Sequence, residues 1–394
     1  MTTRAVVAGV GMIPFTTPSR TDTYDAMGAQ AAVAALQDAG IGYGAVEQAY
    51  AGYVYGDSTC GQAALYRVGT TGIPVVNVNN NCSTGSSALF LARQAIEHGV
   101  ADVVLAVGFE QMQRGALTAM YTDRPSPFGR FDEVVRAVEG DSEVPFAPRF
   151  FGAAGREYAE KYGLAEDTYA RISVKARRHA ANNPYAVFRD PVTVEEVMGS
   201  PAVYGSLTRL QCCPPTCGAA AAVLVSEDYA RSNGLPVDVV IRAQAMRTDT
   251  ASTFDEASPM KVVGYDMAKA AADAVYQSSG VDPLDIPVVE LHDCFTTNEL
   301  LSYEALGLTP EGTAEKFILD EDNTYGGRVV TNPSGGLLSK GHPLGATGLA
   351  QCTELVWQLR GQAGPRQVDG ARIALQHNVG LGGAAVVTLY EKVG

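Results

Sequence analysis

The chain has 394 residues, of which 46% are hydrophobic, and its formal net charge is −14. A chain of this length exceeds one ordinary hydrophobic core, so we expect two or more packed units. The negative charge disfavours broad binding to nucleic acid or to an anionic membrane surface, and a phosphate-bearing ligand would need a local basic patch.

The N-terminal segment and the cysteines indicate the cellular compartment in which the protein is expected to work. The first segment, MTTRAVVAGVGMIPF, has too short an apolar part for a signal peptide and is typical of a first strand. No apolar run approaches the roughly 18 residues of a membrane-spanning helix. The seven cysteines show no paired metal-ligand spacing, even in the segment CCPPTC. We therefore predict a cytoplasmic protein with free thiols and no metal.

Short apolar runs alternate with helical patterns at both ends of the chain. Strands are predicted over residues 3–12, 46–54, 73–79, 101–108, 371–380 and 382–392, and helices over residues 25–40, 86–99 and 349–361. Continuous apolar strands that alternate with helices predict parallel sheets covered on both faces.

Residues 116–200 break this pattern and predict an inserted loop domain. The segment begins with a loop-rich stretch and continues into helices, and it holds the densest basic cluster of the chain. Two interpretations of this cluster stay open: a solvated helix face, or a binding site for the phosphates of a ligand. The cluster consists of Arg171, Lys175, Arg177, Arg178 and His179.

The C-terminal part repeats the plan of the N-terminal part. Segment 101–110 matches segment 371–380 in type, and segment 218–230 resembles segment 382–392. Such internal similarity predicts two duplicated α/β halves. The predicted halves are residues 1–115 with 201–235, and residues 236–394.

Cys82 stands where an apolar strand gives way to a helical pattern, in the segment NNNCSTGSSAL. Backbone N–H groups and the helix dipole favour an anion at such a position. We therefore expect the pKa of this thiol to fall below its ordinary value of about 8.5. The small residues that follow would let a ligand approach the backbone. The alternative interpretation is a buried structural cysteine.

Three of the five histidines lie in unusual settings near the C-terminus. His292 stands with Cys294 in ELHDCF, His342 lies in the glycine-rich segment SKGHPLGATG, and His377 lies in QHNVG. A lone histidine is usually a surface or packed residue, but active sites gather at strand ends in parallel α/β proteins. A cysteine with a histidine is the minimum set for chemistry by an activated thiolate.

These segments resemble the thiolases, and within them the thiolase of the sterol carrier protein 2 (SCP-x) type. The resemblance covers nearly the whole chain. It rests on NNNCSTGSSAL, NNPYAVF, LTRLQCCPPTCGAAAAVL, ELHDCFTTNELLSYEALGL, DNTYGGRVVTNPSGGLLSKGHPLGATGLAQ and QHNVGLGGAAVVTLY. It implies an α/β protein with the five-layer αβαβα thiolase fold, in which two duplicated halves with mixed sheets carry an inserted loop domain.

The resemblance also implies roles for single residues. Cys82 matches the nucleophile that becomes acylated, and His342 matches the base that activates it. His292 stands where many thiolases have an asparagine that holds a water in an oxyanion site. Cys294 matches the second cysteine, which acts as acid and base in this subtype.

Other positions are less settled. Elsewhere in the family the second cysteine comes from a C-x-G motif, which corresponds here to HNVG, and the sequence leaves open whether His377 or Asn378 fills that slot. The N–H groups of Cys82 and Gly380 are expected to form a second oxyanion site. Cys217 stands where the family often has an aspartate.

The ligands and partners implied are those of the family. We expect no permanently bound cofactor, coenzyme A (CoA) as co-substrate, and its phosphates against the basic cluster of the inserted domain. We expect a homodimer that pairs through the strand at 101–108, or a dimer of two such dimers. The chain ends at Gly394 without a lipid-carrying domain or a Ser-Lys-Leu peroxisomal signal, so cytoplasmic location stays the expectation.

The function implied is that of a 3-ketoacyl-CoA thiolase, an acetyl-CoA acyltransferase of fatty-acid, branched-chain or sterol side-chain metabolism. One alternative is a retro-aldolase that cleaves a 3-hydroxyacyl-CoA and needs no thiol nucleophile; some relatives carry tyrosines in place of Cys294 and His342. Another alternative is a non-catalytic CoA-binding subunit that pairs with a small OB-fold partner. Such a subunit should have lost a catalytic residue, and none is visibly lost.

Overall fold

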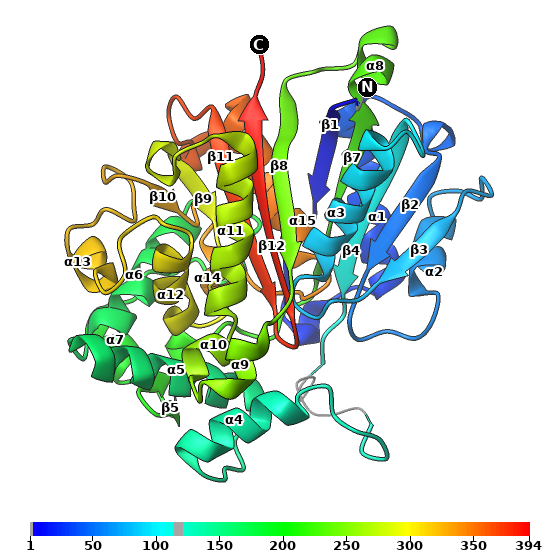
Figure 1. Cartoon of the computed structure of the whole chain (residues 1–394). Helices are drawn as coiled ribbons and strands as arrows, with labels where there is room; N and C mark the ends of the chain where they lie inside the picture. Colours follow the sequence, from blue (N-terminus) through cyan, green and yellow to red (C-terminus); the bar gives the residue numbers. More distant parts are fainter. Residues whose placement is uncertain (1–2, 114–120) are drawn as a thin grey trace.

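The computed structural model describes residues 3–113 and 121–394 (Figure 1). The predicted domain boundary between residues 115 and 116 lies outside the described residues. A mixed ten-stranded sheet runs through the molecule in the order β10-β9-β11-β12-β8-β1-β7-β4-β2-β3. Its first half comprises β1 (Ala5–Met12), β2 (Gln48–Gly52), β3 (Val75–Val78), β4 (Val103–Glu110) and β7 (Gly218–Ser226). Its second half comprises β8 (Val239–Arg247), β9 (Val288–Glu290), β10 (Val330–Thr331), β11 (Ile373–Gly380) and β12 (Ala384–Lys392).

The two halves of the sheet have the same strand order and meet where Val6 of β1 pairs with Val240 of β8. The matched segments 101–110 and 371–380 form β4 and β11, which occupy the same position in their halves. The other matched pair of segments forms β7 and β12, which also correspond. The predicted duplication is therefore confirmed.

Strand direction differs from the expectation of purely parallel sheets. β2 is parallel to β3 and β4, and β9 is parallel to β10 and β11, but β7 and β1 run antiparallel to their neighbours, as do β12 and β8. The reason is clearest in the second half, where the turn at residues 381–383 joins β11 to β12. Such a turn is too short for a parallel crossover, so it forces a hairpin. The mixed sheets implied by the family resemblance are confirmed.

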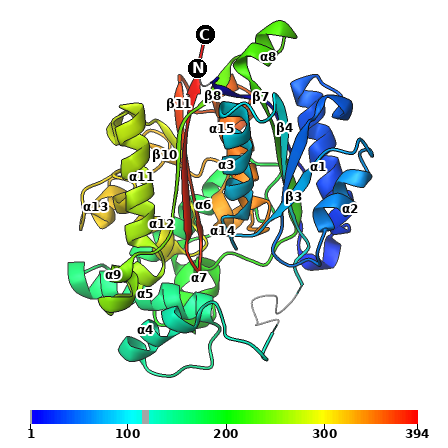
Figure 2. The same cartoon turned by 45° about the vertical axis from the view of Figure 1, so that its right-hand side comes forward.

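The two halves of the sheet form two separate layers, and helices form the other three layers (Figure 2). In the middle, α3 (Thr84–Glu97) contacts α15 (Thr347–Arg360), and these helices pack on strands of both halves. A helix between two sheets has no solvated face, and α15 is accordingly buried along nearly its whole length. The outer layers are α1 (Tyr24–Ala39) with α2 (Cys60–Tyr66), and α11 (Tyr265–Ser279) with α12 (Thr296–Ala305). This arrangement is the predicted five-layer fold.

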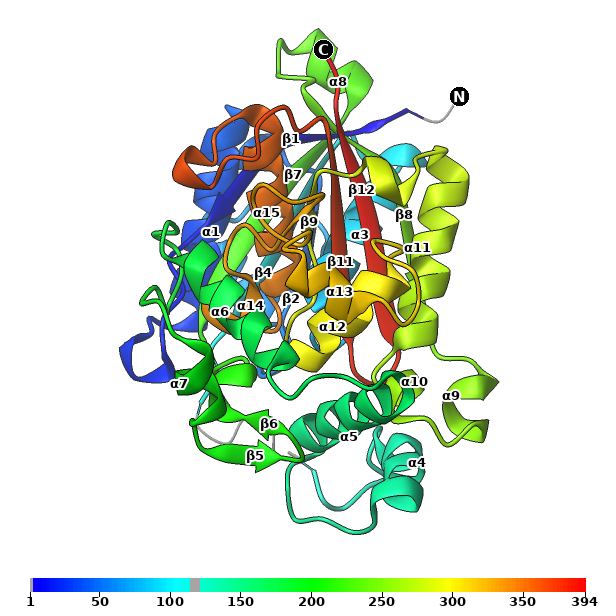
Figure 3. The ribbon, with the colours of Figure 1, turned by 90° about the vertical axis from the view of Figure 1, so that its left-hand side faces the viewer.

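The predicted inserted segment folds against one end of the second half (Figure 3). Its elements are α4 (Gly129–Glu139), α5 (Phe146–Tyr162), α6 (Thr168–Ala180) and α7 (Val194–Met198), followed by the hairpin of β5 (Ala202–Tyr204) and β6 (Leu207–Thr208). They contact α10 (Pro259–Val262), α12, α13 (Ala314–Leu319) and α14 (Gly336–Ser339). The remaining helices are α8 (Glu227–Ser232), α9 (Ala251–Asp255) and the 3₁₀ turns Pro18–Arg20, Tyr43–Ala45, Arg209–Gln211, Pro283–Asp285 and Gly364–Arg366.

The strand at 101–108 cannot pair with a second copy of the chain. It forms β4, which is fully buried and is hydrogen-bonded to β2 on one edge and to β7 on the other. The predicted dimer contact through this strand is therefore wrong. The outermost strand of the first half is β3, and its residue Val76 is 41% exposed. Among the described residues, the structure contains no helix with the length and apolar character needed to cross a membrane.

Candidate active site

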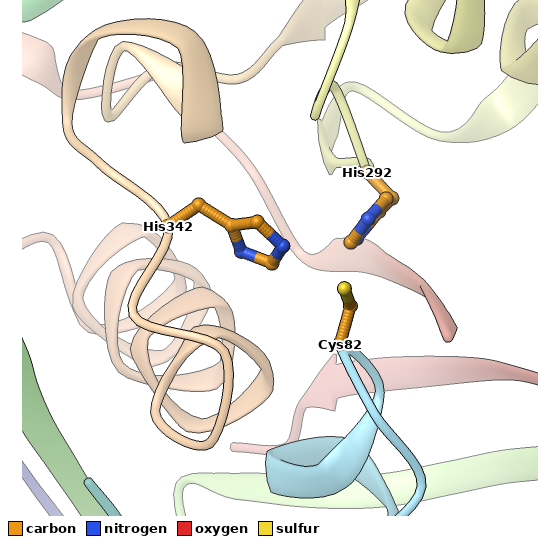
Figure 4. A group of neighbouring side chains, drawn as sticks. All are labelled: Cys82, His292 and His342. Carbon is orange, nitrogen blue, oxygen red and sulfur yellow. The ribbon is translucent and has the colours of Figure 1, made fainter. Parts of the chain in front are cut away.

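Cys82 lies in a tight turn between β3 and α3. Asn81 adopts a left-handed conformation with φ of 51°, which asparagine tolerates better than most residues. The Asn80 carbonyl accepts a hydrogen bond from the N–H of Ser83 (3.2 Å), and the Asn81 carbonyl accepts one from the N–H of Thr84 (3.1 Å). These bonds close the turn, from which the Cys82 side chain points toward the rings of His292 and His342 (Figure 4).

The structure brings three of the predicted residues together (Figure 4). The Cys82 Sγ and one ring nitrogen each of His292 and His342 all lie within 4.8 Å of one another. His292 follows β9, and His342 lies in the loop between α14 and α15. The two rings meet edge to face, with centroids 5.1 Å apart. A thiol and two imidazoles therefore share one small space at the junction of the two halves.

His342 is arranged as a proton acceptor. Its Nδ1 lies 2.7 Å from the Thr347 Oγ1, and the Thr347 hydroxyl donates to the carbonyl of Pro343 (2.9 Å). Since that hydroxyl has one proton, it must accept from His342, so Nδ1 carries the ring proton and Nε2 a free lone pair. Burial lowers the pKa of His342 to about 3. The ring is therefore neutral, with Nε2 available as a base.

His292 is arranged as a hydrogen-bond donor. The Asn378 Nδ2 donates to its Nδ1 at 2.8 Å. A neutral ring that accepts at Nδ1 carries its proton on Nε2. The pKa of His292 is well below its ordinary value, mainly because of burial and further because of His342 and His377. A metal ion at this site is disfavoured, because the protonated Nε2 offers it no lone pair.

The thiol of Cys82 does not have the lowered pKa that its place near a helix start predicted. Burial, and secondarily the carboxylate of Glu110, raise the pKa of Cys82 to about 12. Glu110 ends β4 and accepts from the N–H groups of Tyr55 (2.9 Å) and Gly345 (3.0 Å). Burial also raises its own pKa to about 7. Loss of hydration outweighs the helix dipole, so the thiol is protonated at neutral pH and needs a base.

Cys294 joins the site together with a thiol that the sequence prediction missed. The pKa of Cys294 is raised well above its ordinary value by burial first and then by Cys213 and Cys82. The Cys213 N–H donates to the carbonyl of Cys294 at 2.8 Å. The backbones of Cys213 and Cys294 are therefore in contact, and the Cys213 thiol is near enough that, after burial, charge on Cys82 raises its pKa as well. No pattern in the sequence connects Cys213 to residues more than 80 positions away. Cys217 lies elsewhere, with its Sγ against the Met112 carbonyl (3.3 Å).

His377 and Asn378 separate at the end of β11, because successive side chains of a strand point to opposite faces. Asn378 contacts His292, whereas both ring nitrogens of His377 are buried and have no hydrogen-bond partner among the described residues. Gly380 lies against the backbone of the turn that carries Cys82, where a Cβ would collide with the Asn80 carbonyl. A glycine at this position allows the two backbones to approach.

The basic cluster on α6 is divided between the interior and the surface. Lys175 is 4% exposed and forms an ion pair with Glu299, with Thr331 beside it. The prediction that Lys175 binds a CoA phosphate is wrong, because the buried carboxylate already neutralises its ammonium group. His179 is also buried, with its ring between the Asn332 carbonyl (3.0 Å) and the Thr324 hydroxyl (2.7 Å).

The arginines of this cluster lie outside the cavity that opens on Cys82. Arg171 pairs with Asp167 (2.6 Å) and Arg178 with Glu321 (3.3 Å), while Arg177 lies over the ring of Phe188. Their contact with CoA stays a prediction.

A cavity of about 550 Å³ opens on Cys82. Its walls are mainly apolar, with Arg124 as a cationic group in the lining. The sequence prediction missed this lining because it comes from loops far apart in the chain. The apolar lining residues include Val54, Phe128, Phe146, Leu344 and Leu381.

Comparisons with known proteins agree with this fold. The family model for the thiolase N-terminal domain matches residues 5–228, and the model for the thiolase C-terminal domain-like family matches residues 249–391. Sterol carrier protein 2 of Rattus norvegicus is 55% identical over 392 residues, which cover 98% of this chain and 72% of that protein. Non-specific lipid-transfer protein-like 2 of Caenorhabditis elegans is 43% identical over 98% of this chain and 96% of its own.

Solved structures give the same fold. An Ltp2-ChsH2(DUF35) aldolase superposes with a TM-score of 0.83 at 23% identity, covering 99% of this chain and 98% of its own. Human mitochondrial 3-ketoacyl-CoA thiolase in complex with CoA superposes with a TM-score of 0.75 at 18% identity, covering 100% and 98%. At these identities the likeness shows the fold alone. From the matched family models and the relatives above, the chain belongs to the thiolase family, resembles within it the thiolase of sterol carrier protein 2, and is an acyltransferase enzyme.

Proposed function

We propose that the protein is a 3-ketoacyl-CoA thiolase that works through an acyl-enzyme on Cys82. The observation that carries this proposal is the pair of opposite tautomers around one thiol. His342 offers a lone pair that can take the thiol proton, and His292 offers an N–H that can stabilise a developing negative charge.

The first step is attack on the substrate. His342 Nε2 takes the proton of Cys82 as the sulfur attacks the 3-keto carbon of a 3-ketoacyl-CoA. Burial raises the pKa of Cys82 to about 12 and lowers that of His342 to about 3, so the neutral thiol and the neutral imidazole are favoured in the free enzyme. The proton therefore moves only as the C–S bond forms, which is general-base catalysis. The backbone N–H groups of Cys82 and Gly380 receive the negative charge on the former keto oxygen.

The second step breaks the bond between C2 and C3. The bonding electrons move into the thioester as an enolate, and the acyl group stays on Cys82. His292 Nε2–H stabilises the enolate oxygen, with His342, which now carries a proton on Nε2, as a second donor. The thiol of Cys294 gives its proton to C2, and acetyl-CoA leaves.

Free CoA completes the cycle. Its thiol gives a proton to Cys294 and attacks the acyl group on Cys82. The tetrahedral intermediate then expels the Cys82 sulfur, which regains its proton from His342. Each group thereby returns to its starting state, and no bound cofactor takes part beyond CoA as co-substrate.

The arrangement of Cys82 and His342 disfavours the two alternatives. A retro-aldolase would have no use for a thiol within reach of a dedicated base, and the fold likeness to an aldolase complex does not bear on chemistry. A non-catalytic CoA-binding subunit, with or without a small OB-fold partner, would not need both histidines held in defined tautomers.

The broader setting follows from the same proposal. The mainly apolar cavity beside Cys82 suits the acyl chain of a fatty, branched or sterol side-chain thioester. A homodimer fits a chain whose outermost strand, β3, exposes the apolar Val76 at a sheet edge. Light scattering tests the dimer, and a fully active species of 41.4 kDa would contradict it.

The deciding experiment follows the thioester absorbance of acetoacetyl-CoA in the presence of CoA. A thiolase consumes it only when free CoA is present and yields two acetyl-CoA. Release of an aldehyde or ketone from a 3-hydroxyacyl-CoA without CoA would instead establish the aldolase. CoA binding without either reaction would establish the non-catalytic subunit.

A further inference from the structure

A row of buried polar side chains crosses the middle layer behind His292. It starts at Tyr390 of β12, passes Gln376 of β11 and Ser86 of α3, and ends at Asn378 of β11. All four side chains are fully buried or nearly so. A buried network in which every polar group is hydrogen-bonded stabilises one arrangement of its side chains. A network with unpaired polar groups destabilises the fold.

One end of the row has an unambiguous direction. Gln376 Nε2 donates to the backbone carbonyl of Gly348 at 2.7 Å. Since a carbonyl can only accept, the nitrogen of the Gln376 amide must face α15 and its oxygen must face Tyr390, whose hydroxyl donates to it (2.5 Å). Only one of the two possible orientations of the Gln376 amide is therefore compatible with its hydrogen-bond partners.

The direction then passes to Asn378. The second N–H of Gln376 Nε2 donates to Ser86 Oγ at 2.8 Å. The Ser86 hydroxyl must send its own proton elsewhere, and Asn378 Oδ1 lies 2.9 Å away. Because the oxygen of the Asn378 amide is taken by Ser86, its nitrogen faces His292 Nδ1, 2.8 Å away.

Backbone geometry makes the Asn378–His292 contact a fixed part of the fold. β11 and β9 pair in parallel with Gln376 opposite Glu290, the last residue of β9, and two residues further along each chain Asn378 contacts His292. Gly348 is required nearby, because a Cβ there would collide with Ser86 and with the Asn378 oxygen.

We propose that Asn378 is a positioning residue that fixes the tautomer of His292. By donating to Nδ1 it keeps the ring proton on Nε2, where it meets the enolate oxygen. This role rests on the proposed thiolase function for its kinetic effect, but the tautomer itself is a property of the resting enzyme. An aspartate at this position would favour the opposite tautomer. Its carboxylate can only accept, so it would hold the ring proton on Nδ1 and leave Nε2 unprotonated.

The test is Asn378→Asp, read by ¹⁵N NMR of protein labelled in its histidines. With five histidines in the chain, the His292 signals can be assigned from their absence in His292→Gln. Wild type should show an unprotonated Nδ1 and a protonated Nε2. Asn378→Asp should show the reverse near pH 8, with kcat for thiolysis lower by about 10²–10³-fold, as for loss of an oxyanion donor, and KM little changed.

The pH profile separates positioning from a general structural role. In Asn378→Asp the new carboxylate favours a second proton on His292, so acidification should restore Nε2–H. The ratio of the variant's kcat to the wild-type kcat should therefore rise as the pH falls. The titratable groups around His292 are His342 and Cys82, which share its space, His377, which acts on its pKa from the other face of β11, and Asp293 and Cys294, which are beside it in the chain. They are present in both proteins, so the difference between the two profiles reports the substitution.

A second variant keeps the test decisive if Asn378→Asp does not fold. Ser86→Ala removes the proton that holds the Asn378 oxygen, so the amide can turn and the two tautomers of His292 should exchange, with a smaller fall in kcat. Thr353→Val is the matched control, because it removes a buried hydroxyl from α15 that donates within its own helix (2.9 Å). It should leave both the spectrum and kcat unchanged.

The outcomes are distinct. A wild-type His292 tautomer in Asn378→Asp, or in Ser86→Ala where the first variant does not fold, overturns the positioning role whatever happens to the rate. A reversed tautomer in a protein that turns out not to be a thiolase would support the positioning role and remove only the proposed reaction.

Discussion

His292 and His342 share one space with the Cys82 sulfur and offer the same ring atom, Nε2, in opposite protonation states. The rings are neutral and 5.1 Å apart, yet one accepts at Nδ1 from Asn378 and the other donates at Nδ1 to Thr347. Two chemically identical side chains thus become a donor and a base through partners that lie behind them. The predictions below separate these functions.

Cys82→Ala should abolish acyl transfer, because no other group in the proposed mechanism can hold the acyl chain. After incubation with a 3-ketoacyl-CoA, mass spectrometry should find the acyl mass on the Cys82 peptide of wild type. Acylation of the Cys213 peptide instead would transfer the role of nucleophile to the neighbouring thiol.

His342→Ala should slow acylation of Cys82 by about 10²–10⁴-fold, the usual contribution of a positioned base. Thr347→Val should have a smaller effect in the same direction, since it removes only the acceptor that holds the proton on Nδ1. Rapid-quench measurement of the acyl-enzyme gives both rates. Acylation at the wild-type rate in His342→Ala would show that another group takes the proton.

Cys294→Ala should abolish exchange of the acetyl-CoA methyl protons with deuterated water. It should still allow Cys82 to be acylated by a simple acyl-CoA, because that step moves no proton at carbon. NMR of acetyl-CoA follows the exchange. If the variant exchanges deuterium at the wild-type rate, the acid–base role belongs elsewhere, and Cys213→Ala becomes the next variant to measure.

Glu110→Gln should lower the pKa of Cys82, because the Glu110 carboxylate is, after burial, the second cause of its raised pKa. The effect should grow above pH 7, since the pKa of Glu110 is itself about 7 and its charge develops there. Alkylation of the Cys82 peptide by iodoacetamide, measured across pH, should therefore be faster in the variant.

Glu47→Gln is the matched control for this measurement. Its carboxylate also accepts from backbone N–H groups, those of Asp102 and Val103, but at the other end of β4. An alkylation profile that is the same in wild type, Glu110→Gln and the control would show that burial alone sets the pKa of Cys82.

Arg124→Glu should raise KM for CoA, because Arg124 lines the cavity that opens on Cys82 and reversal of its charge repels a polyanion. Arg178→Glu is the comparison, since Arg178 belongs to the basic cluster predicted from the sequence and, like Arg124 with Asp123, pairs with a carboxylate, that of Glu321. The rise for Arg124→Glu should shrink at high salt. A larger rise for Arg178→Glu would place the phosphates at the predicted cluster.

The sequence identified the groups with reactive side chains but not the settings that give them their properties. Cys82, His292, Cys294 and His342 were found because each stands in a distinctive motif at a strand or helix boundary. The raised pKa of Cys82 was missed, because burial and the approach of Glu110 exist only in the tertiary structure.

The absence of tertiary contacts from the sequence also explains two further wrong predictions, those for Lys175 and for the dimer contact. Lys175 sits in a basic run of sequence, but its partner Glu299 comes from another helix more than a hundred residues away. The apolar pattern of β4 shows that the strand is buried, but it does not show that β2 and β7 occupy both edges. Periodicity reports the environment of an element and says little about its neighbours.

The duplication has a consequence for how the reactive pair came to be divided. Cys82 precedes α3 in the first half, and His342 precedes α15, the corresponding helix of the second half. The starts of these helices touch, with the backbone N–H of Gly348 only 3.1 Å from where a Cβ on Gly85 would lie. The two halves thus place the proposed nucleophile and its proposed base at corresponding positions, one in each half. Neither half carries both groups, so the proposed reaction requires the two halves to be packed together. Activity therefore measures correct folding of the whole chain.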